Sequence, residues 1–375
     1  MDKNNTCFFS KFIIMTNKKE IKKEEITLDN GTHALASFPV IVSASRATDI
    51  PAFYADWFFN RLEKGYSSWK NPFNGVRYYV AYRETRFVIF WSKNPYNLIK
   101  HLNKLKERNI NCYVQFTLND YIDEELEKGV PSVDFRIKTF KELVEKLGPG
   151  HVVWRFDPLI LTDKISLNDL LRKIEYIGDR LKGYTEKLVF SFADILSYGR
   201  VKKNLEKSGV NYIDWTEDAM TEFAARLCKL NKEKWNYTLS TCGERIDFSK
   251  YRIEHNKCVD DELIIKLAHT DKRLMEYLGV KLVDTRSPID LFTPIVIPEG
   301  AINVGNGIYA VKSQRKTKAA GQREFCQCIE SKDIGEYNTC PHMCEYCYAN
   351  TSKEQAKINW EKHKFNPSSE NITGL

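Results

Sequence analysis

No stretch of the sequence approaches the roughly 20 consecutive apolar residues that a membrane-spanning helix requires. The longest apolar run near the start, CFFSKFIIM, is broken by Lys11 and has neither a basic leader nor a small-residue cleavage site. We therefore expect no signal peptide, no membrane partner and a cytoplasmic location. The sequence also has no internal repeat and no low-complexity tract. These absences leave an ordinary soluble globular protein as the expected class.

A large excess of charge of one sign is also lacking. The 57 Lys and Arg residues against 50 Asp and Glu residues give a net charge of +7, which is mild for 375 residues. Such a charge permits an anionic partner such as nucleic acid without requiring one. With 42% hydrophobic and 13% aromatic residues, the chain can bury a sizeable core in one large domain or in a domain with appendages.

Short apolar runs alternate along the chain with helical patterns. Strands are predicted at 38–45, 86–92, 110–117, 151–156, 187–193 and 237–242. Helices are predicted from Asp49 to Gly65, from Asn94 onward, and at 133–147, 166–182 and 215–230. Most of these strands have no hairpin signal between them. The pattern therefore predicts a parallel sheet covered by helices, and six or more such units favour a (β/α) barrel, closed or partial.

This pattern suggests three regions. We expect an N-terminal extension over 1–37, the barrel body over 38–310, and a cysteine-rich segment over 311–375 that completes the barrel mouth. The polar strand ends should meet at that mouth. They carry Arg46, Asp49, Lys93, Asn94, Arg155, Asp157, Asp194 and Glu244.

The strand-end residues are the candidate active-site residues. The predicted catalytic residues are Arg155, Asp157, Lys93, Arg46 and Asp49, and the predicted cofactor-binding residues are Glu244, Asn94 and Asp194. The alternative for each is an ordinary polar loop residue. Arg155 carries more weight because it follows HVVW in a strand expected to be buried, where an unpaired charge is costly. An ion pair with a purely structural role remains the alternative for Arg155 and Asp157.

Ten cysteines in a reducing compartment favour metal binding over disulfides, and half of them fall between 326 and 347. Cys340, Cys344 and Cys347 form a C-x3-C-x2-C array in CPHMCEYCYAN. Three thiolates from one loop leave one iron of a four-iron cluster free for a non-protein ligand. A zinc ribbon is the alternative. His342, inside the array, is expected to donate a hydrogen bond to a cluster sulfur.

Four further cysteines suggest a second metal site. If the C-terminal segment folds back over the mouth, Cys242, Cys258, Cys326 and Cys328 would supply four thiolates for a second cluster or a zinc ion. The alternative is that Cys242 and Cys258 are small buried core residues. Cys112 and Cys228 lie among apolar residues, so both are expected to belong to the core.

The array C-x3-C-x-aromatic-C resembles the cluster signature of radical S-adenosylmethionine enzymes. More widely, SASRATDIPAFY, FWSKNP, WRFDP, TCGE, QREFCQC and SKDIGEYNTCPHMCEYCYAN resemble an uncharacterised family called domain of unknown function 1848, over about 39–352. These resemblances imply a 4Fe-4S cluster whose open iron binds S-adenosylmethionine, and an electron donor. The array stands near the C-terminus instead of after the first strand, and no Gly-Gly-Glu stretch is present.

A permuted barrel explains the position of the array. DIGEYNT as a strand, the cysteine loop, and SKEQAKINWEKH as a helix would supply a first β/α unit at the end of the chain. The predicted function is a radical S-adenosylmethionine enzyme that forms a 5'-deoxyadenosyl radical, with nucleic acid as the expected substrate. The alternative is a non-catalytic iron-sulfur or zinc protein that binds nucleic acid through VKSQRKTKAAGQR, which contains Lys312, Arg315, Lys316, Lys318 and Arg323.

Overall fold

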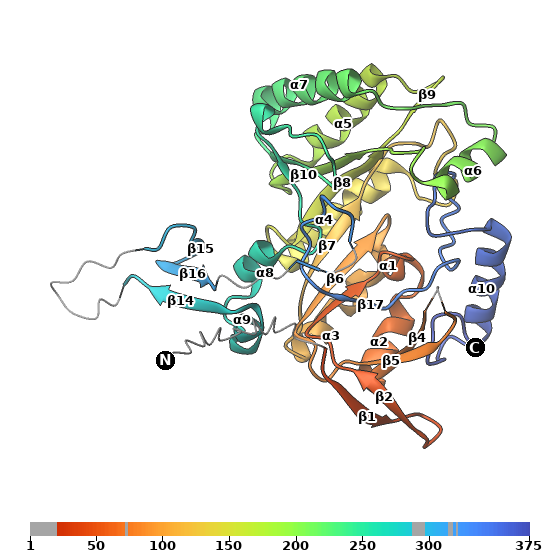
Figure 1. Cartoon of the computed structure of the whole chain (residues 1–375), viewed down its shortest axis with the longest axis vertical. Helices are drawn as coiled ribbons and strands as arrows, with labels where there is room; N and C mark the ends of the chain where they lie inside the picture. Colours follow the sequence, from red (N-terminus) through yellow and green to blue (C-terminus); the bar gives the residue numbers. More distant parts are fainter. Residues whose placement is uncertain (1–20, 72–73, 287–296, 314–317, 320–321) are drawn as a thin grey trace, which may run out of the picture.

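The largest element of the fold is an eight-stranded parallel sheet (Figure 1). The computed structural model describes residues 21–71, 74–286, 297–313, 318–319 and 322–375. The sheet has the order β13-β12-β10-β8-β7-β6-β3-β17, and each neighbouring pair is parallel. Its strands are β3 (Ile41–Ala44), β6 (Phe87–Ser92), β7 (Asn111–Thr117), β8 (Val152–Leu159), β10 (Lys187–Phe192), β12 (Thr238–Thr241), β13 (Ile253–His255) and β17 (Lys332–Asp333).

The strand order follows the chain from β3 to β13, and β17 alone departs from it. Although β17 is the last strand in the sequence, it pairs with β3, with Lys332 opposite Val42 and Asp333 opposite Ser43. The prediction of a parallel sheet in an α/β fold is confirmed. No pairing joins β13 to β17 in the described part of the chain, so a closed barrel is not observed.

Most of the helices lie between strands of this sheet, and the last one follows β17. They are α1 (Ile50–Phe53), α2 (Ala55–Lys64), η1 (Pro95–His101), α3 (Leu102–Glu107), α4 (Val133–Leu147), α5 (Leu167–Leu181), α6 (Gly199–Lys207), α7 (Glu217–Lys234), η2 (Ser249–Tyr251), α8 (Asp261–Ala268), α9 (Lys272–Leu278) and α10 (Lys353–Phe365). Side-chain caps fix several starts, including Ser132 of α4 and the capping box of Ser166 and Asp169 at α5. The helices predicted at 133–147, 166–182 and 215–230 are confirmed.

Two other predicted elements differ in detail. The single helix expected from Asp49 to Gly65 is two helices, because Tyr54 between them has non-helical backbone angles. The strand expected over 333–339 is limited to β17. The chain turns at Gly335, whose N–H donates to Asp333 Oδ1 at 3.0 Å. A side chain at Gly335 would lie 2.0 Å from Ser45 Oγ, so this close approach requires glycine.

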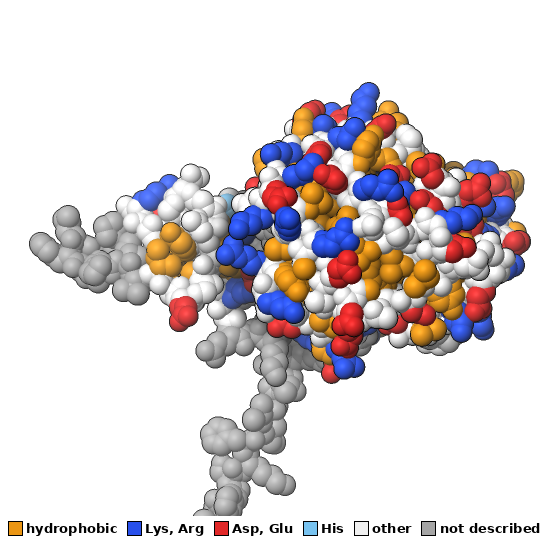
Figure 2. Space-filling model, turned by 90° about the horizontal axis from the view of Figure 1, so that it is seen from above, with side chains coloured by type: hydrophobic (Ala, Val, Ile, Leu, Met, Phe, Trp, Pro, Cys, Tyr) orange, Lys and Arg blue, Asp and Glu red, His pale blue; other side chains and the backbone are white. Residues whose placement is uncertain are grey.

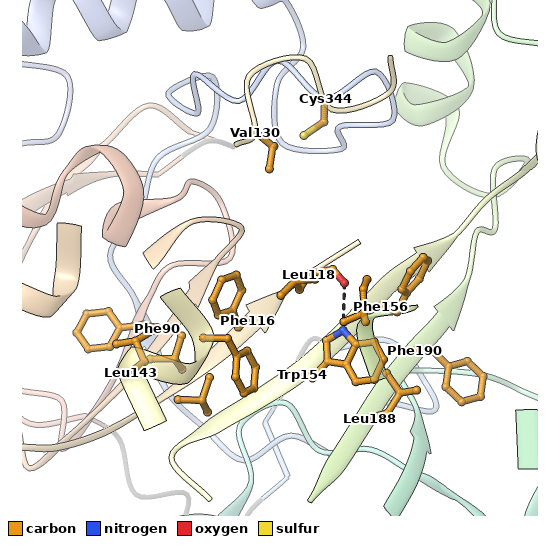
Figure 3. Close-up of a cluster of buried hydrophobic side chains, with 14 of the residues drawn as sticks. Phe90, Phe116, Leu118, Val130, Leu143, Trp154, Phe156, Leu188, Phe190 and Cys344 are labelled. Carbon is orange, nitrogen blue, oxygen red and sulfur yellow. Dashed lines mark hydrogen bonds between the residues drawn. The ribbon is translucent and has the colours of Figure 1, made fainter. Parts of the chain in front are cut away.

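The two faces of the sheet belong to two buried clusters. Alternate strand residues such as Val88 and Trp154 pack with the helices in the larger cluster, part of which Figure 3 shows, including the 3.0 Å hydrogen bond from Trp154 to the Leu118 carbonyl. Their neighbours on the opposite face, such as Phe87, pack with Ile264 of α8 in the second cluster. That cluster also contains Cys258 and Cys328, so the second face is covered by late segments of the chain.

Three smaller sheets accompany the main one. One has the order β1-β2-β5-β4, with β1 (Lys23–Thr27), β2 (His33–Ser37), β4 (Tyr66–Lys70) and β5 (Arg77–Ala81). Another joins β14 (Val280–Asp284), β16 (Ile308–Lys312) and β15 (Ile302–Gly305), and it projects to one side beyond α8 and α9 (Figure 1). The third pairs β9 (Leu161–Thr162) with β11 (Tyr212–Ile213). Residues 23–37 of the expected extension thus form strands, while residues 1–20 lie outside the described residues.

Candidate functional site

The cysteine loop Cys340–Cys347 lies between β17 and α10, at the carboxyl end of the sheet. Burial raises the pKa of all three thiols, Cys340, Cys344 and Cys347. Backbone N–H groups point at two of the sulfurs. Those of Asp49 and His342 donate to Cys340, and that of Asn350 lies 3.3 Å from Cys347 Sγ. Cys344 is therefore buried and the other two cysteines are partly buried, and burial favours the neutral form of all three thiols.

Main-chain contacts with the segment after β7 hold this loop in place. The Gly129 N–H donates to the His342 carbonyl at 3.0 Å, and the Glu345 N–H donates to the Leu126 carbonyl at 2.9 Å. A side chain at Gly129 would lie 2.6 Å from the His342 carbonyl oxygen, so the approach requires glycine. Figure 3 shows Cys344 beside Val130, and both belong to the larger buried cluster. The loop is therefore part of the packed core.

Asp49 links the loop to β3 and β6. Its carboxylate accepts hydrogen bonds from the Ser92 hydroxyl at 2.7 Å and from the Lys93 N–H at 2.7 Å, and it lies 2.8 Å from Nε2 of His342. Burial by itself would raise the pKa of Asp49, but these partners hold it below its usual range. His342 thus faces Asp49 with its ring and Cys340 with its backbone, whereas the sequence suggested a side-chain bond to sulfur.

Lys93 belongs to a buried network with residues from the segment after β7, from α4 and from the cysteine loop. Its Nζ lies 2.6 Å from Glu127 Oε1 and 2.9 Å from the Tyr346 hydroxyl, and Asn119 Nδ2 lies 3.1 Å from both acceptors. Arg136 lies 3.8 Å from the other Glu127 oxygen. Burial favours the neutral acid, but the charges of Lys93 and Arg136 lower the pKa of Glu127 to about 2. Two cations therefore share one buried anion beneath the cysteine loop.

Arg155 and Asp157 form the expected ion pair at the end of β8. Arg155 Nε donates to Asp157 Oδ2 at 3.2 Å, a second guanidinium nitrogen contacts the same oxygen, and Ser191 donates to Oδ1. Burial opposes ionisation of Asp157, but Arg155 and Ser191 hold its pKa below the usual range. Asn119 Oδ1 accepts from the Asp157 N–H at 2.8 Å, and so joins this pair to the Lys93 network.

The four remaining candidate ligands also come together. Cys242 Sγ and Cys258 Sγ are 3.3 Å apart, and Cys328 Sγ accepts from the Cys258 N–H at 3.2 Å. The Cys326 and Cys328 thiols are in hydrogen-bonding contact. Arg155 Nη1 lies 3.2 Å from Cys258 Sγ, so the ion pair of β8 adjoins this group. The C-terminal segment therefore folds back toward the ends of β12 and β13, which is the condition under which these four cysteines were expected to meet.

Arg46 and Asn94 lie at the ends of β3 and β6. The Arg46 N–H donates to Asp333 Oδ2 at 2.8 Å, and its guanidinium lies 5.6 Å from the Trp91 ring centre. Arg46 thus ties β3 to the turn after β17. Asn94 Oδ1 is buried without a hydrogen-bond partner, which leaves an acceptor open for a ligand.

Glu244 and Asp194 lie after β12 and β10. Glu244 accepts from the Phe192 N–H at 3.1 Å, and burial raises the pKa of its carboxyl to about 7. Asp194 is exposed and accepts from the Ser197 N–H at 3.2 Å, within its own turn. Among the described residues, no hydrogen bond joins either carboxylate to the cysteine loop.

The family model described as Domain of unknown function (DUF1848) matches residues 41–349. The chain belongs to this family. No curated protein and no solved structure matches the chain. The DUF1848 match runs from β3 through the cysteine loop, so it contains both groups of cysteines.

The described part of this DUF1848 chain contains no formed metal site, because no three Cys, His, Asp or Glu side chains have the arrangement needed to hold an ion. A search of the same residues finds no helix that is long and apolar enough to span a membrane. Of the basic stretch, Arg315 and Lys316 lie outside the described residues. Lys312 pairs with Asp261 at 2.9 Å, and Arg323 Nη2 lies 3.8 Å from Cys242 Sγ.

Sequence reasoning missed Glu127, Arg136, Ser191 and Arg323. Glu127 lies in an acidic run, NDYIDEELEKG, in which nothing marks one carboxylate as buried. The alternation of strand residues places Ser191 on the same face of β10 as Val189, but the sequence does not indicate Asp157 as its hydrogen-bond partner. The sequence indicates Arg323 only as a member of the basic stretch expected to contact nucleic acid. Its contact with Cys242 depends on a long-range fold that local spacing does not encode.

Proposed function

We propose that this DUF1848 protein is an iron-sulfur enzyme whose loop of Cys340, Cys344 and Cys347 holds a 4Fe-4S cluster and S-adenosylmethionine. The observation that carries the proposal is the place of this loop in the strand order. Taken with β17 first, the order β17-β3-β6-β7-β8-β10-β12-β13 becomes strictly sequential, as in a permuted partial (β/α) barrel. The loop then follows the first strand, where the resembling radical enzymes carry their cluster.

The donor set suits a cluster with one open iron. Three thiols on one loop, one buried and two partly buried, supply three ligands, and cluster binding releases their protons because thiolates are the ligands. The N–H donors at Cys340 and Cys347 would stabilise sulfur that carries negative charge. Lys93 brings a positive charge close to Cys344. When bound, the cluster and S-adenosylmethionine would supply a radical that abstracts a hydrogen atom from a substrate.

Unpartnered polar atoms near the loop support a ligand there. Thr48 Oγ1, Asn94 Oδ1 and Asn350 Oδ1 are buried without hydrogen-bond partners. Buried polar atoms are rarely left in this state, so each is a candidate contact for a polar cofactor. In the proposal Arg155 and Asp157 orient a polar group of the cofactor or substrate, Lys93 supports the loop through Tyr346, and burial excludes water from the reacting atoms.

The alternative of a non-catalytic nucleic-acid-binding protein has less support. Lys318 donates to the Glu324 carbonyl at 2.8 Å, and Lys312 is held in an ion pair, so these described members of the basic stretch are engaged within the chain. On the face shown in Figure 2, basic and acidic side chains are interspersed. A surface that follows a phosphate backbone would gather positive charge along one path.

Anaerobic reconstitution tests the proposal directly. After incubation with iron and sulfide, we expect about four irons and four sulfides per loop site, in line with a cluster held by thiolates. We also expect the electron paramagnetic resonance signal of the reduced protein to change when S-adenosylmethionine is added, because it would bind the open iron. The proposal is contradicted if the protein binds neither iron nor sulfide. It is also contradicted if S-adenosylmethionine leaves the electron paramagnetic resonance signal unchanged.

Asp157→Asn should preserve the fold and the iron but lower 5'-deoxyadenosine formation under dithionite by about 10-fold to 100-fold. The amide is equal in size but leaves Arg155 without its anion, and a hydrogen bond to a charged group is worth about 1.5–3 kcal/mol. Iron content and thermal melting are measured alongside product. Asp163→Asn, at an exposed residue after β9, is the matched control. Unchanged product formation would assign the ion pair to structure alone.

A further inference from the structure

Four cysteines outside the loop form a second group from three parts of the chain. Cys242 follows β12, Cys258 follows β13, and Cys326 and Cys328 precede β17. The sulfurs of Cys242 and Cys258 are 3.3 Å apart, and the Cys328 thiol contacts those of both Cys258 and Cys326. The proposed function of the loop does not use this group, so it requires an account of its own.

The spacing of these sulfurs distinguishes a single ion from a cluster. Four Zn–S bonds of about 2.3 Å in tetrahedral geometry place neighbouring sulfurs about 3.8 Å apart. In a 4Fe-4S cluster each thiolate binds a different iron, which holds the sulfurs further apart. We propose that Cys242, Cys258, Cys326 and Cys328 bind one tetrahedral ion of the zinc class. By contrast, no hydrogen bond joins two sulfurs of the cysteine loop within the described residues.

Two arginines lie beside the sulfurs of such a site. A divalent ion with four thiolates has a net charge of −2, which is costly to bury without counter-charges. Arg155 Nη1 lies 3.2 Å from Cys258 Sγ, and Arg323 Nη2 lies 3.8 Å from Cys242 Sγ. Both guanidinium groups thus place positive charge beside the sulfurs, although Arg155 also pairs with Asp157 and so offsets the charge of the site only in part. This pairing gives Arg323 a role that is independent of nucleic acid.

Nitrogen donors complete the surroundings of the sulfurs. The N–H groups of Cys258 and Val259 lie 3.2 Å and 3.4 Å from Cys328 Sγ, and Asn256 Nδ2 lies 3.4 Å from Cys258 Sγ. Such donors orient thiolate ligands and stabilise their charge. The sulfur contacts run as a chain from Cys242 through Cys258 and Cys328 to Cys326. Closing the tetrahedron therefore requires the two outer thiols to turn toward a common ion.

The ion would hold the C-terminal segment against the face of the sheet that packs in the second buried cluster. The Ile329 N–H already donates to the Val259 carbonyl at 3.1 Å, and the Cys258 carbonyl accepts from Tyr113 of β7 at 2.7 Å. Beyond Cys328 the chain continues into β17 and the cysteine loop. The zinc site thus fixes the path by which the loop reaches the opposite edge of the sheet.

Metal analysis of the full chain tests this site separately from the cluster. The triple variant Cys340→Ala, Cys344→Ala, Cys347→Ala removes the loop ligands, and should still hold about one zinc per chain because all four ligands of the second site remain. Adding Cys328→Ser to it should abolish that zinc, whereas adding Cys228→Ser, on α7, should not. Cobalt added to the metal-free triple variant should give the visible bands of a tetrahedral tetrathiolate site.

Each outcome bears on the proposal. Three results would overturn it. One is iron with sulfide in the triple variant, and another is a Cys242–Cys258 disulfide by mass spectrometry. The third is free titration of all four thiols of the proposed site in the presence of zinc. If Cys328→Ser prevents folding, the cobalt spectrum of the triple variant still decides the ligand set. Failure of the loop cluster in the native chain leaves these results unaffected, so the two proposals stand or fall separately.

Discussion

We expect the Cys344→Ala protein, reconstituted without oxygen, to lose the iron of the cysteine loop and all formation of 5'-deoxyadenosine. Cys344 is buried, and it is one of three thiols that the proposed cluster requires. Loss of a direct ligand should exceed the roughly 10-fold to 100-fold loss of metal affinity caused by removing an outer partner. Cys340→Ala and Cys347→Ala should behave in the same way. Iron and sulfide are counted beside the product.

Cys228→Ala is the matched control, because Cys228 lies on α7 away from both groups of cysteines. Its iron content should equal that of the native chain. Equal loss of iron from Cys228→Ala and Cys344→Ala would mean that the assay reports damage to the fold instead of loss of a ligand.

Glu127→Gln should lower the free energy of unfolding by about 3–5 kcal/mol, because it leaves two buried cations without their shared anion. The Glu127 side chain is fully buried, as is that of Arg136, and that of Lys93 is 17% exposed. Urea denaturation at neutral pH measures the change. The cysteine loop should also loosen, because Tyr346 donates to Glu127. We therefore expect faster release of iron from the variant.

Glu63→Gln provides the comparison. Glu63 pairs with Lys104 at 2.6 Å on the surface, where solvent screens the interaction. Its substitution should change unfolding far less than that of Glu127. Similar effects from the two substitutions would show that the network beneath the loop is not dehydrated.

The sequence predicted the main sheet well because its strands are short, apolar and separated by helices. β7 and β8 were placed to within a few residues by their β-branched and aromatic side chains. The hairpins of β4–β5 and β15–β16 were missed. In β5 the alternation is obscured by RYYVA, with its adjacent aromatic residues, and β13 is too short to show a period.

The candidate site was predictable where its side chains lie near the end of a predicted strand. Arg155 and Asp157 stand two residues apart on β8, so their pairing followed from period 2. The two groups of cysteines followed from spacing and compartment. The Lys93 network did not, because its anion comes from a loop and its second cation from α4. Such a network depends on tertiary packing, which single-sequence patterns do not specify.

The position of β17 also has a consequence for synthesis on the ribosome. Strands β3 to β13 emerge in the order in which they pair, so most of the sheet can form while the chain is still growing. Until Lys332 and Asp333 emerge, β3 has an open edge able to pair with another chain. The ligands of the cysteine loop are translated later still. Binding of the proposed cluster would thereby be deferred until the rest of the sheet has been made, and we expect a nascent chain that stalls before this point to be exposed to aggregation at β3.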